Sequence, residues 1–465
     1  MSFSLFNRKQ QKKPPLVKET DQARHEKIET LKAGRLATLA LELTDKLINS
    51  FGPRIAGSEQ TRETAAELEK EFKQYCDTTE YKEFPLYNLG YTLWLKVLVV
   101  IYPLALVLLL VGLPFLATCI LCLFLLYVLR EFIFFKPVAE KYTPKATGAN
   151  VHGVIEPQGE VLHTVLFSGH HDSARLYKYN PLDKLTYAKK VLLPLMLFLL
   201  LCVASLTQLF TELFTGRFFS VNLPPVPCLI LNVVLTLCFP FVLSLWGFVT
   251  FEGSPGAGDN LVSSCMGVEL ARFFDWKKRC GQGLDHTRLV FASFDGEEVG
   301  LKGSRVWFRE NELLCKDGLL LNFDCPYYAG ELTFLERDIN GTQPLSSRLA
   351  RRCVLIAKSM GYEATSQSIP FLAGGTDAAE ASRSGLEACS LTAVAWDDTS
   401  RPAVYHTKDD VVAAIEPDAI EQALSIAIRL VELVETDMLY EKEPASEPAV
   451  EEKFPELRFK SFTLR

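Results

Sequence analysis

The 465-residue sequence lacks an excess of basic residues, since 49 Lys and Arg stand against 56 Asp and Glu, a net charge of −7. Nucleic acids are bound through basic surfaces, so this balance argues against nucleic acid as the main partner. The 12 cysteines show no framework spacing, which is typical of a reducing compartment. Residues 1–15 are basic but contain no apolar run, so we expect no cleavable signal peptide. The sequence also has no internal repeat.

Long apolar blocks are what the sequence does have, and they raise the mean hydropathy to +0.13. The first block, residues 92–129, is interrupted only by Lys96. One membrane-spanning helix needs about 20 residues, so this block predicts a hairpin that turns near residues 112–114. The second block has two runs, 191–210 and 223–251. We therefore expect four transmembrane helices in two hairpins, because runs this long are rarely buried core helices.

These blocks divide a soluble α/β domain into pieces. Strands alternate with helices outside the blocks, which predicts a three-layer sandwich with a mostly parallel central sheet. The expected parts are a disordered start (1–20), helices that begin the domain (21–91), a first hairpin (92–135), more of the domain (136–190), a second hairpin (191–251), the rest of the domain (252–440) and a tail (441–465).

An acidic turn follows one predicted strand. The apolar run 289–294 is expected to be a buried strand, which Asp295 and Gly296 end, and Glu297 and Glu298 come next. Strand ends are where an α/β sheet presents its chemistry. Neighbouring side chains there point in different directions, so one carboxylate can hold a metal while the other handles a proton. Taken alone, two glutamates are more often a solvated turn before a helix.

Four more polar residues lie at predicted strand ends or in loops: His170, Asp259, Asp324 and His406. With Glu298 they make a set of two imidazoles and three carboxylates, which suits two zinc ions. Two carboxylates about 4 Å apart repel by roughly 4 kcal/mol at an effective dielectric near 20. Three carboxylates that converge on one place therefore favour a bound cation. Each of these residues taken alone is a weak signal.

A series of segments, in this order along the chain, resembles the M28 family of co-catalytic zinc aminopeptidases. The segments are FGPRIAGS (51–58), SGHHDS (168–173), GAGDN (256–260), FDGEEVGLKGS (294–304), LNFD (321–324), GGTDAA (374–379) and YHTKDD (405–410). The resemblance covers the soluble regions between about 49 and 440 and none of the apolar blocks. It implies a zinc-peptidase-like fold and a peptide substrate.

The resemblance also implies the metal ligands, residue by residue. His170 and Asp324 would bind one zinc ion, Glu298 and His406 would bind the other, and Asp259 would bridge the two.

Further roles follow from the same resemblance. Glu297 would be the general base, and Asp172 would orient the imidazole of His170. Thr376, Asp377 and His171 are expected in supporting positions around the site. One departure is Gly258, where many relatives carry an acid.

The expected ligands constrain the membrane arrangement. His170 precedes the second block and the other ligands follow it, so this block must cross the membrane an even number of times. Basic residues flank the spans on the enzyme side, whereas the opposite loops carry only Arg217, and the positive-inside rule then predicts a cytoplasmic enzyme. The flanking residues are Lys96, Arg130, Lys136, Lys141, Lys184, Lys189 and Lys190.

Several functions stay open at this point. The complete ligand set favours a membrane-anchored aminopeptidase with two zinc ions. A non-catalytic scaffold or receptor with the same fold, a carboxypeptidase and a glutaminyl cyclase are the alternatives. A competing topology places the enzyme on the other side of the membrane. The sequence gives no indication of oligomeric state or natural substrate.

Overall fold

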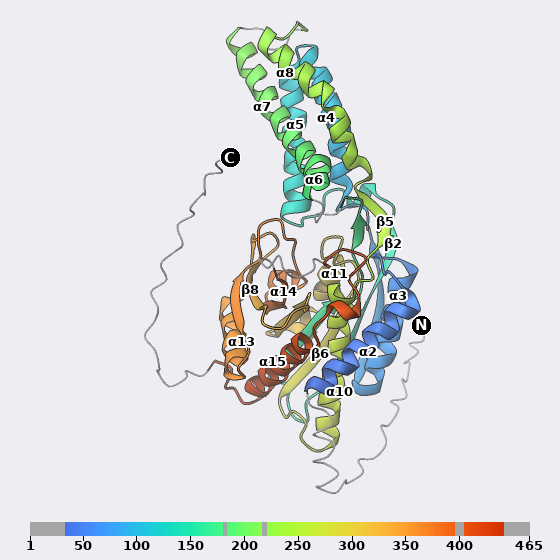
Figure 1. Cartoon of the computed structure of the whole chain (residues 1–465). Helices are drawn as coiled ribbons and strands as arrows, with labels where there is room; N and C mark the ends of the chain where they lie inside the picture. The colour runs from blue at the N-terminus through green and yellow to red at the C-terminus, as the bar shows by residue number, and fades with distance from the viewer. Residues whose placement is uncertain (1–32, 180–183, 216–220, 396–403, 441–465) are drawn as a thin grey trace, which may run out of the picture.

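The computed structural model describes residues 33–179, 184–215, 221–395 and 404–440. An α/β domain carries a slender bundle of helices that projects from one end (Figure 1). The start and the tail for which the sequence predicts disorder, 1–20 and 441–465, lie outside the described residues.

A mixed sheet of nine strands forms the middle of the α/β domain, in the order β1-β2-β6-β3-β7-β11-β8-β10, with β9 paired to β8. Its centre, from β6 through β3 and β7 to β11, is parallel, whereas β1, β2 and the β11–β8 pair are antiparallel. The α/β class with a parallel central sheet is therefore confirmed. The strands are β1 (Thr78–Leu86), β2 (Ala146–Ile155), β3 (His163–His170), β6 (Thr287–Phe294), β7 (Leu319–Asp324), β8 (Leu332–Asp338), β9 (Gln343–Pro344), β10 (Ala364–Ser368) and β11 (Glu387–Thr392).

Helices cover both faces of this sheet, because successive strand residues point to opposite sides. Val165 and Phe167 pack toward one set of helices, and Leu166 packs toward the other. The first set is α2 (Ala33–Phe51), α3 (Glu59–Tyr75), α10 (Val262–Arg279), α13 (Ser347–Ser359) and α15 (Pro417–Glu435). The second set is α11 (Lys302–Glu310), α12 (Glu312–Cys315) and α14 (Ala378–Arg383).

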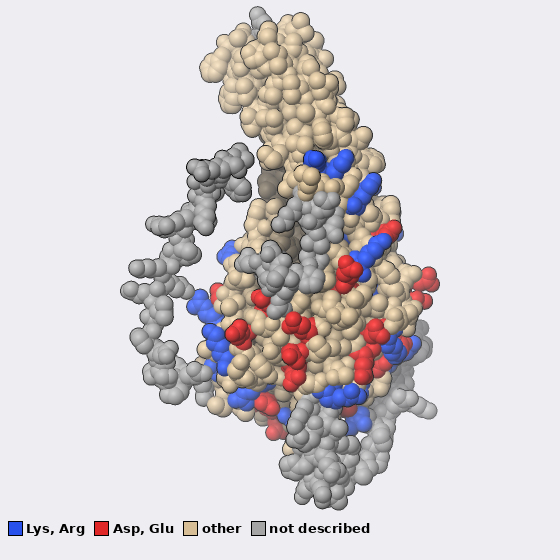
Figure 2. Space-filling model, viewed as in Figure 1, with Lys and Arg blue, Asp and Glu red and all other residues tan. Residues whose placement is uncertain are grey.

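The helical bundle has an apolar core of its own. It contains α4 (Leu93–Leu110), α5 (Pro114–Val128), the short α6 (Lys184–Tyr187), α7 (Leu193–Phe214), α8 (Val226–Leu237) and α9 (Phe239–Val242). Three helices are long and apolar enough to cross a membrane, and α8 with the helices that follow it would make a fourth if this bent pair counts as one span. Lys and Arg side chains gather where the bundle meets the domain, and the visible face of the bundle beyond them shows no charge of either sign (Figure 2).

The second half of this bundle differs from the expectation of one straight helix over 223–251. Helix α8 ends at Leu237, and the chain bends by 43° before the next helical segment. Pro240 lies in the first turn of α9, and a proline removes a backbone donor and prevents an unbroken helix. Residues Val249–Gly253 form strand β5, so the boundary at 251 was wrong and the helical part ends at Gly247.

Each half of the bundle is a helical insertion between two strands that pair with each other in antiparallel fashion. The first half lies between β1 and β2, in which Leu86 pairs with Ala146. The second half lies between β4 (Arg175–Tyr177) and β5 (Val249–Gly253), in which Tyr177 pairs with Val249. The chain therefore leaves and re-enters the domain at neighbouring points, both at the same end of the bundle.

Candidate metal centre

The carboxyl ends of three parallel neighbours bring four of the expected residues to one edge of the sheet. His170 and Asp324 are the last residues of β3 and β7, and Glu297 and Glu298 follow β6 after the turn of Asp295 and Gly296. Strand β3 lies between β6 and β7 with parallel pairing to both. The sequence order of strand, turn and acid thus places these side chains together, as parallel strands require.

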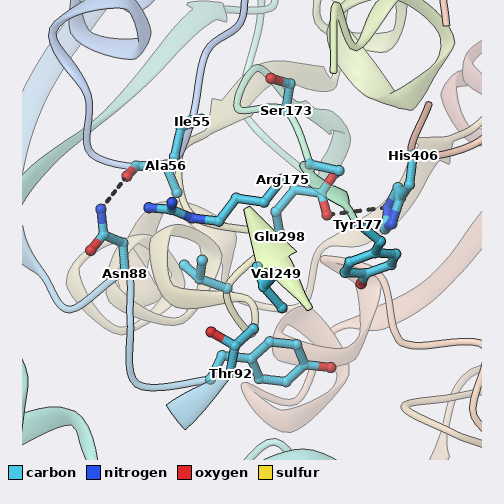
Figure 3. A pocket seen from close by; sticks show the side chains of 13 residues that line it. Ile55, Ala56, Asn88, Thr92, Ser173, Arg175, Tyr177, Val249, Glu298 and His406 are labelled. Carbon is cyan, nitrogen blue, oxygen red and sulfur yellow. Dashed lines mark hydrogen bonds and ion pairs between the residues drawn. The ribbon is translucent and has the colours of Figure 1, made fainter. Parts of the chain in front are cut away.

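Asp259 faces both imidazoles. Its Oδ1 lies 3.4 Å from Nε2 of His170, and its Oδ2 lies 3.0 Å from Nε2 of His406. The same His406 nitrogen is 3.3 Å from Oε2 of Glu298, a pair that Figure 3 shows at one end of a cleft. One carboxylate therefore joins two groups of side chains whose members come from four separate parts of the chain.

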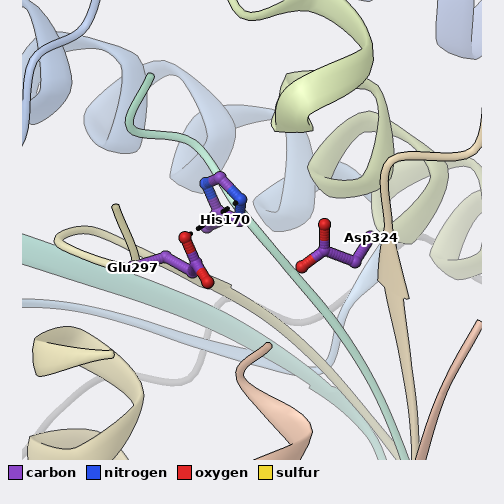
Figure 4. Close-up of side chains that lie close together, drawn as sticks. All are labelled: His170, Glu297 and Asp324. Carbon is purple, nitrogen blue, oxygen red and sulfur yellow. Dashed lines mark ion pairs between the residues drawn. The ribbon is translucent and has the colours of Figure 1, made fainter. Parts of the chain in front are cut away.

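Glu297 stands on the other side of this arrangement. Its Oε2 is 3.7 Å from Nε2 of His170, and Asp324 completes the group (Figure 4). Candidate ligand atoms lie within 4.8 Å of one another in this trio, in the trio of Asp259, Glu298 and His406, and in a trio of Asp259, Asp324 and Cys325. The thiol of Cys325 was not among the residues expected from the sequence.

The donor atoms fit a cation. Four of them are buried and have no hydrogen-bond partner among the described residues, although buried polar atoms are nearly always paired. These atoms are Nε2 of His170, Nε2 of His406, Oδ2 of Asp259 and Oε1 of Glu298. Imidazole and carboxylate are the ligands that zinc accepts in open sites.

The pKa values report an excess of negative charge in the cluster. Burial raises the pKa of Asp324 to about 8 and the pKa of Glu298 to about 7, and in both cases the charge of Asp259 adds to the effect. Burial also raises the pKa of Glu297, despite the opposing influence of His170. Burial disfavours the charged form of His406, but Glu298 and Asp259 hold its pKa well above the ordinary value. Divalent cations relieve this kind of conflict between carboxylates.

Asp172 contacts both the turn that carries Glu297 and Glu298 and the imidazole of His170. Its two carboxylate oxygens each accept a backbone N–H, from Glu297 and from Glu298, at 3.2 Å. Nδ1 of His170 lies 3.1 Å from the Asp172 carbonyl oxygen and 3.4 Å from its Oδ1. Asp172 thus fixes the direction of the ring and the position of the turn together.

Two buried charged residues that the sequence analysis did not single out hold the loops of the site. Arg54 donates from Nε to the carbonyl oxygen of His171 and from Nη2 to that of Gly256, both at 2.8 Å. Asp410 accepts the backbone N–H groups of Gly258 and Asp259. Both lie within segments that carry the family resemblance, but their contacts with distant backbone atoms have no local signal in the sequence.

Gly258 stands where many relatives carry an acid, and the neighbouring ring of Tyr327 explains the glycine. A Cβ atom on Gly258 would lie 2.0 Å from the ring of Tyr327, so the ring occupies the space that a larger residue needs. The Tyr327 side chain is 1% exposed, and its pKa is raised by burial and by the charge of Asp410. A glycine at 258 and a tyrosine at 327 therefore form a matched pair.

The three supporting residues take different positions. His171 is buried with Nδ1 2.7 Å from Oγ of Ser293, and it is not among the lining residues of the cleft in Figure 3. Thr376 binds Asp338 through its backbone N–H and its hydroxyl. Asp377 is buried near the cluster, where its charge helps to raise the pKa of Glu297.

This is the setting in which comparisons with known proteins are informative. Residues 246–431 match the model of peptidase family M28. This match indicates a zinc-peptidase type of hydrolase with a peptide substrate. His170 and Asp172 precede the matched region, but the fold brings them to the same cluster.

Several solved structures are similar in outline. The zinc aminopeptidase BSAP from Bacillus subtilis has a TM-score of 0.48 and 14% identity, covering 86% of this chain and 95% of that one. The aminopeptidase from Aneurinibacillus sp. strain AM-1 has a TM-score of 0.49 and 13% identity, covering 87% and 95%. The glutaminyl cyclase from Porphyromonas gingivalis has a TM-score of 0.47 and 12% identity, covering 85% and 97%. No curated protein matches the chain.

Proposed function

We propose that this protein is a membrane-anchored exopeptidase that removes N-terminal residues from peptides and uses two zinc ions. The observation that carries the proposal is the position of Asp259, whose two carboxylate oxygens face the imidazoles of His170 and His406. His170, Asp259 and Asp324 would hold one ion, and Asp259, Glu298 and His406 would hold the other. Zinc bound there would polarise the scissile carbonyl and acidify a water molecule.

Glu297 is the residue that moves the proton in this proposal. Its carboxylate lies beside His170 and Asp324, in one of the three trios of candidate ligand atoms, and the proposal assigns it the proton and assigns Asp259 to both ions. Oε2 takes a proton from the attacking water and passes it to the leaving amine, the behaviour of a general base that becomes a general acid. Asp172 keeps Glu297 in place through the backbone of the turn.

Metal content and peptide release test the proposal together. The wild type should bind two zinc ions and release N-terminal residues from chromogenic amides. Glu297→Gln should keep both ions and lose about 100- to 10,000-fold in kcat, the usual contribution of a general base. Glu298→Gln should lose zinc as well, whereas Glu252→Gln, an exposed glutamate paired with Lys408, should change neither.

Other results favour the alternatives. Less than one zinc ion per chain and no turnover would indicate a scaffold with the peptidase fold. One zinc ion with cyclisation of N-terminal glutamine would indicate a cyclase, and release of C-terminal residues only would indicate a carboxypeptidase. Full activity of Glu297→Gln would refute the assigned base.

The bundle supports a membrane anchor of four spans with the peptidase domain in the cytoplasm. Three helices and one bent pair have the required length and composition, and basic residues lie at the domain end of the bundle. An epitope inserted after Gly112, in the turn between α4 and α5, should be reached by antibody on intact cells. An epitope after Tyr142, which is 74% exposed, should be reached only after permeabilisation. The reverse pattern would place the enzyme on the outer face.

A further inference from the structure

A cleft leads from the candidate metal centre toward the base of the helical bundle. Its first part is lined by Glu298 and His406 at one end and by Tyr91 and Thr92 near the start of α4. Its second part is lined by residues from the base of the bundle such as Leu95 and Trp246.

Arg175 lies where the two parts meet. Thr92, Arg175 and Val249 line both parts, so the two parts adjoin at the arginine. Figure 3 shows the Arg175 side chain among these lining residues, in the same cleft as the paired Glu298 and His406. Arg175 belongs to strand β4, five residues after His170, so the same short segment supplies a candidate ligand and this guanidinium.

The guanidinium is held in place, and no carboxylate of the described residues neutralises its charge. Nη1 lies 3.4 Å from the carbonyl oxygen of Thr250, and Cζ lies 5.3 Å from the centre of the Phe251 ring. Nε is buried without a hydrogen-bond partner, and no ion pair joins Arg175 to a carboxylate among the described residues. Burial lowers the pKa of Arg175, the direction expected when a cation has lost water and gained no anion.

We infer that Arg175 binds a carboxylate of the substrate and thereby selects peptides with an anionic group close to the scissile bond. Arginine is suited to this role because its planar fork binds a carboxylate through two parallel hydrogen bonds. The carboxylate has two possible sources, the free C-terminus of a di- or tripeptide and an acidic side chain of a longer peptide. This inference rests on the proposed peptidase function and assigns its substrate class.

Matched peptides test the inference and separate the two sources. The free acid Leu-Ala-Ala and its carboxamide differ only in the terminal charge, and Leu-Glu-Ala-amide and Leu-Gln-Ala-amide differ only in the side-chain charge. Wild-type enzyme should cleave the charged member of at least one pair with a higher kcat/KM. Arg175→Gln should lower kcat/KM for that member about 10- to 100-fold, the loss expected for hydrogen bonds to a charged group, and leave the neutral member nearly unchanged.

Two further variants define the effect. Arg175→Lys keeps the charge but loses the fork, so it should recover part of the preference. Lys178→Gln is the matched control, because Lys178 is an exposed cation three residues away that lines neither part of the cleft. An equal loss on charged and neutral peptides in Arg175→Gln would overturn the inference, since it would indicate a structural role.

Binding without turnover separates this inference from the proposed function. In the Glu297→Gln background, calorimetric titration should show tighter binding of the charged peptide, and the difference should vanish when Arg175→Gln is added. If the wild type hydrolyses no peptide but this difference in binding affinity is seen, the role of Arg175 in binding a carboxylate is supported and the proposed peptidase function is refuted. Hydrolysis of charged and neutral peptides at equal rates refutes the role of Arg175 and leaves the peptidase. A loss confined to affinity for phosphatidylglycerol in mixed micelles overturns the inference in favour of a lipid headgroup.

Discussion

The carboxylate of Asp410 accepts a hydrogen bond from the backbone N–H of Asp259, with Oδ2 and N 3.2 Å apart. The other oxygen, Oδ1, accepts the N–H of Gly258 at 2.8 Å. Asp410 thereby fixes the backbone from which the shared carboxylate projects toward both imidazoles. It acts through position alone, because it belongs to none of the three trios of candidate ligands.

The first prediction concerns this contact. Asp410→Asn has one acceptor oxygen in place of two, so one of the two backbone N–H groups loses its partner. Zinc affinity should fall about 10- to 100-fold, the usual effect of removing a group that orients a ligand. Competition with a chromophoric chelator measures the affinity, and excess zinc should restore activity. Asp409→Asn, at an exposed neighbour, should behave as wild type, and equal losses in the two variants would contradict the assignment.

The matched pair of Gly258 and Tyr327 gives a second prediction. Gly258→Ala should destabilise the domain by roughly 1–3 kcal/mol, because the new methyl group overlaps the tyrosine ring. The cost should shrink when Tyr327→Ala is also present, so the two changes should not add. Gly267→Ala, whose methyl group would lie 3.7 Å from Phe72, should be tolerated. Denaturant unfolding of the four variants in detergent measures these differences, and simple additivity would exclude the overlap.

Glu269 provides a prediction on pH. This residue of α10 is 1% exposed, and burial raises the pKa of its carboxyl to about 7 although Nε of Arg272 lies 2.9 Å away. The folded state therefore holds the proton more tightly than the unfolded state, whose ordinary value is 4.5. The stability from Glu269 is complete below the unfolded value and is lost as the pH rises through about 7.

Glu269→Gln should remove this pH dependence. The free energy of unfolding of the wild type relative to Glu269→Gln should fall by about 2–3 kcal/mol between pH 4.5 and pH 7.5, following the size of the shift. Glu63→Gln, at an exposed position on α3, serves as the control for a change of net charge. A difference that stays constant with pH would show that the carboxyl titrates normally.

The interior of the bundle supplies a fourth prediction. Gln208 of α7 is fully buried, donates to the carbonyl oxygen of Leu109 at 2.9 Å and accepts from Nδ2 of Asn232 at 2.8 Å, so it links α7 to α4 and α8. Gln208→Leu should lower the thermal stability of the bundle by about 1 kcal/mol, the size measured for polar contacts between membrane helices. Thr207→Val, at the exposed neighbour, should have no effect. Unchanged stability of Gln208→Leu would mean that apolar packing alone holds these helices.

The strands that carry the candidate site were predictable from the sequence because they are buried on both faces. The apolar runs of β3, β6 and β7 give this pattern directly. Strands β3 and β7 end at the cluster residues His170 and Asp324, and a short turn after β6 leads to Glu297. Strand β1 was not predicted, since it is an edge strand whose side chains are mostly exposed. The bend after α8 was missed because hydropathy does not register the effect of Pro240.

The candidate site divides in the same way. Its candidate metal ligands lie after predicted strands or within the segments that carry the family resemblance, and both features can be read from the sequence. The positions of Arg54 and Asp410 depend on hydrogen bonds to backbone atoms 117 and 151 residues away, and no local pattern contains that information. Cys325 entered a trio of candidate ligands through its place beside Asp324 in the fold.

The paired strands at the foot of the bundle make the bundle separable from the α/β domain. Leu86 pairs with Ala146, and Tyr177 pairs with Val249. A two-residue hairpin turn can therefore join the two strands of either pair in place of the inserted helices. A shortened chain of this kind would keep the sheet order and every residue of the metal cluster while losing the apolar surface of the helices. The apolar bundle is thus an accessory fitted at two loops, and versions of this fold with and without it are two loop deletions apart.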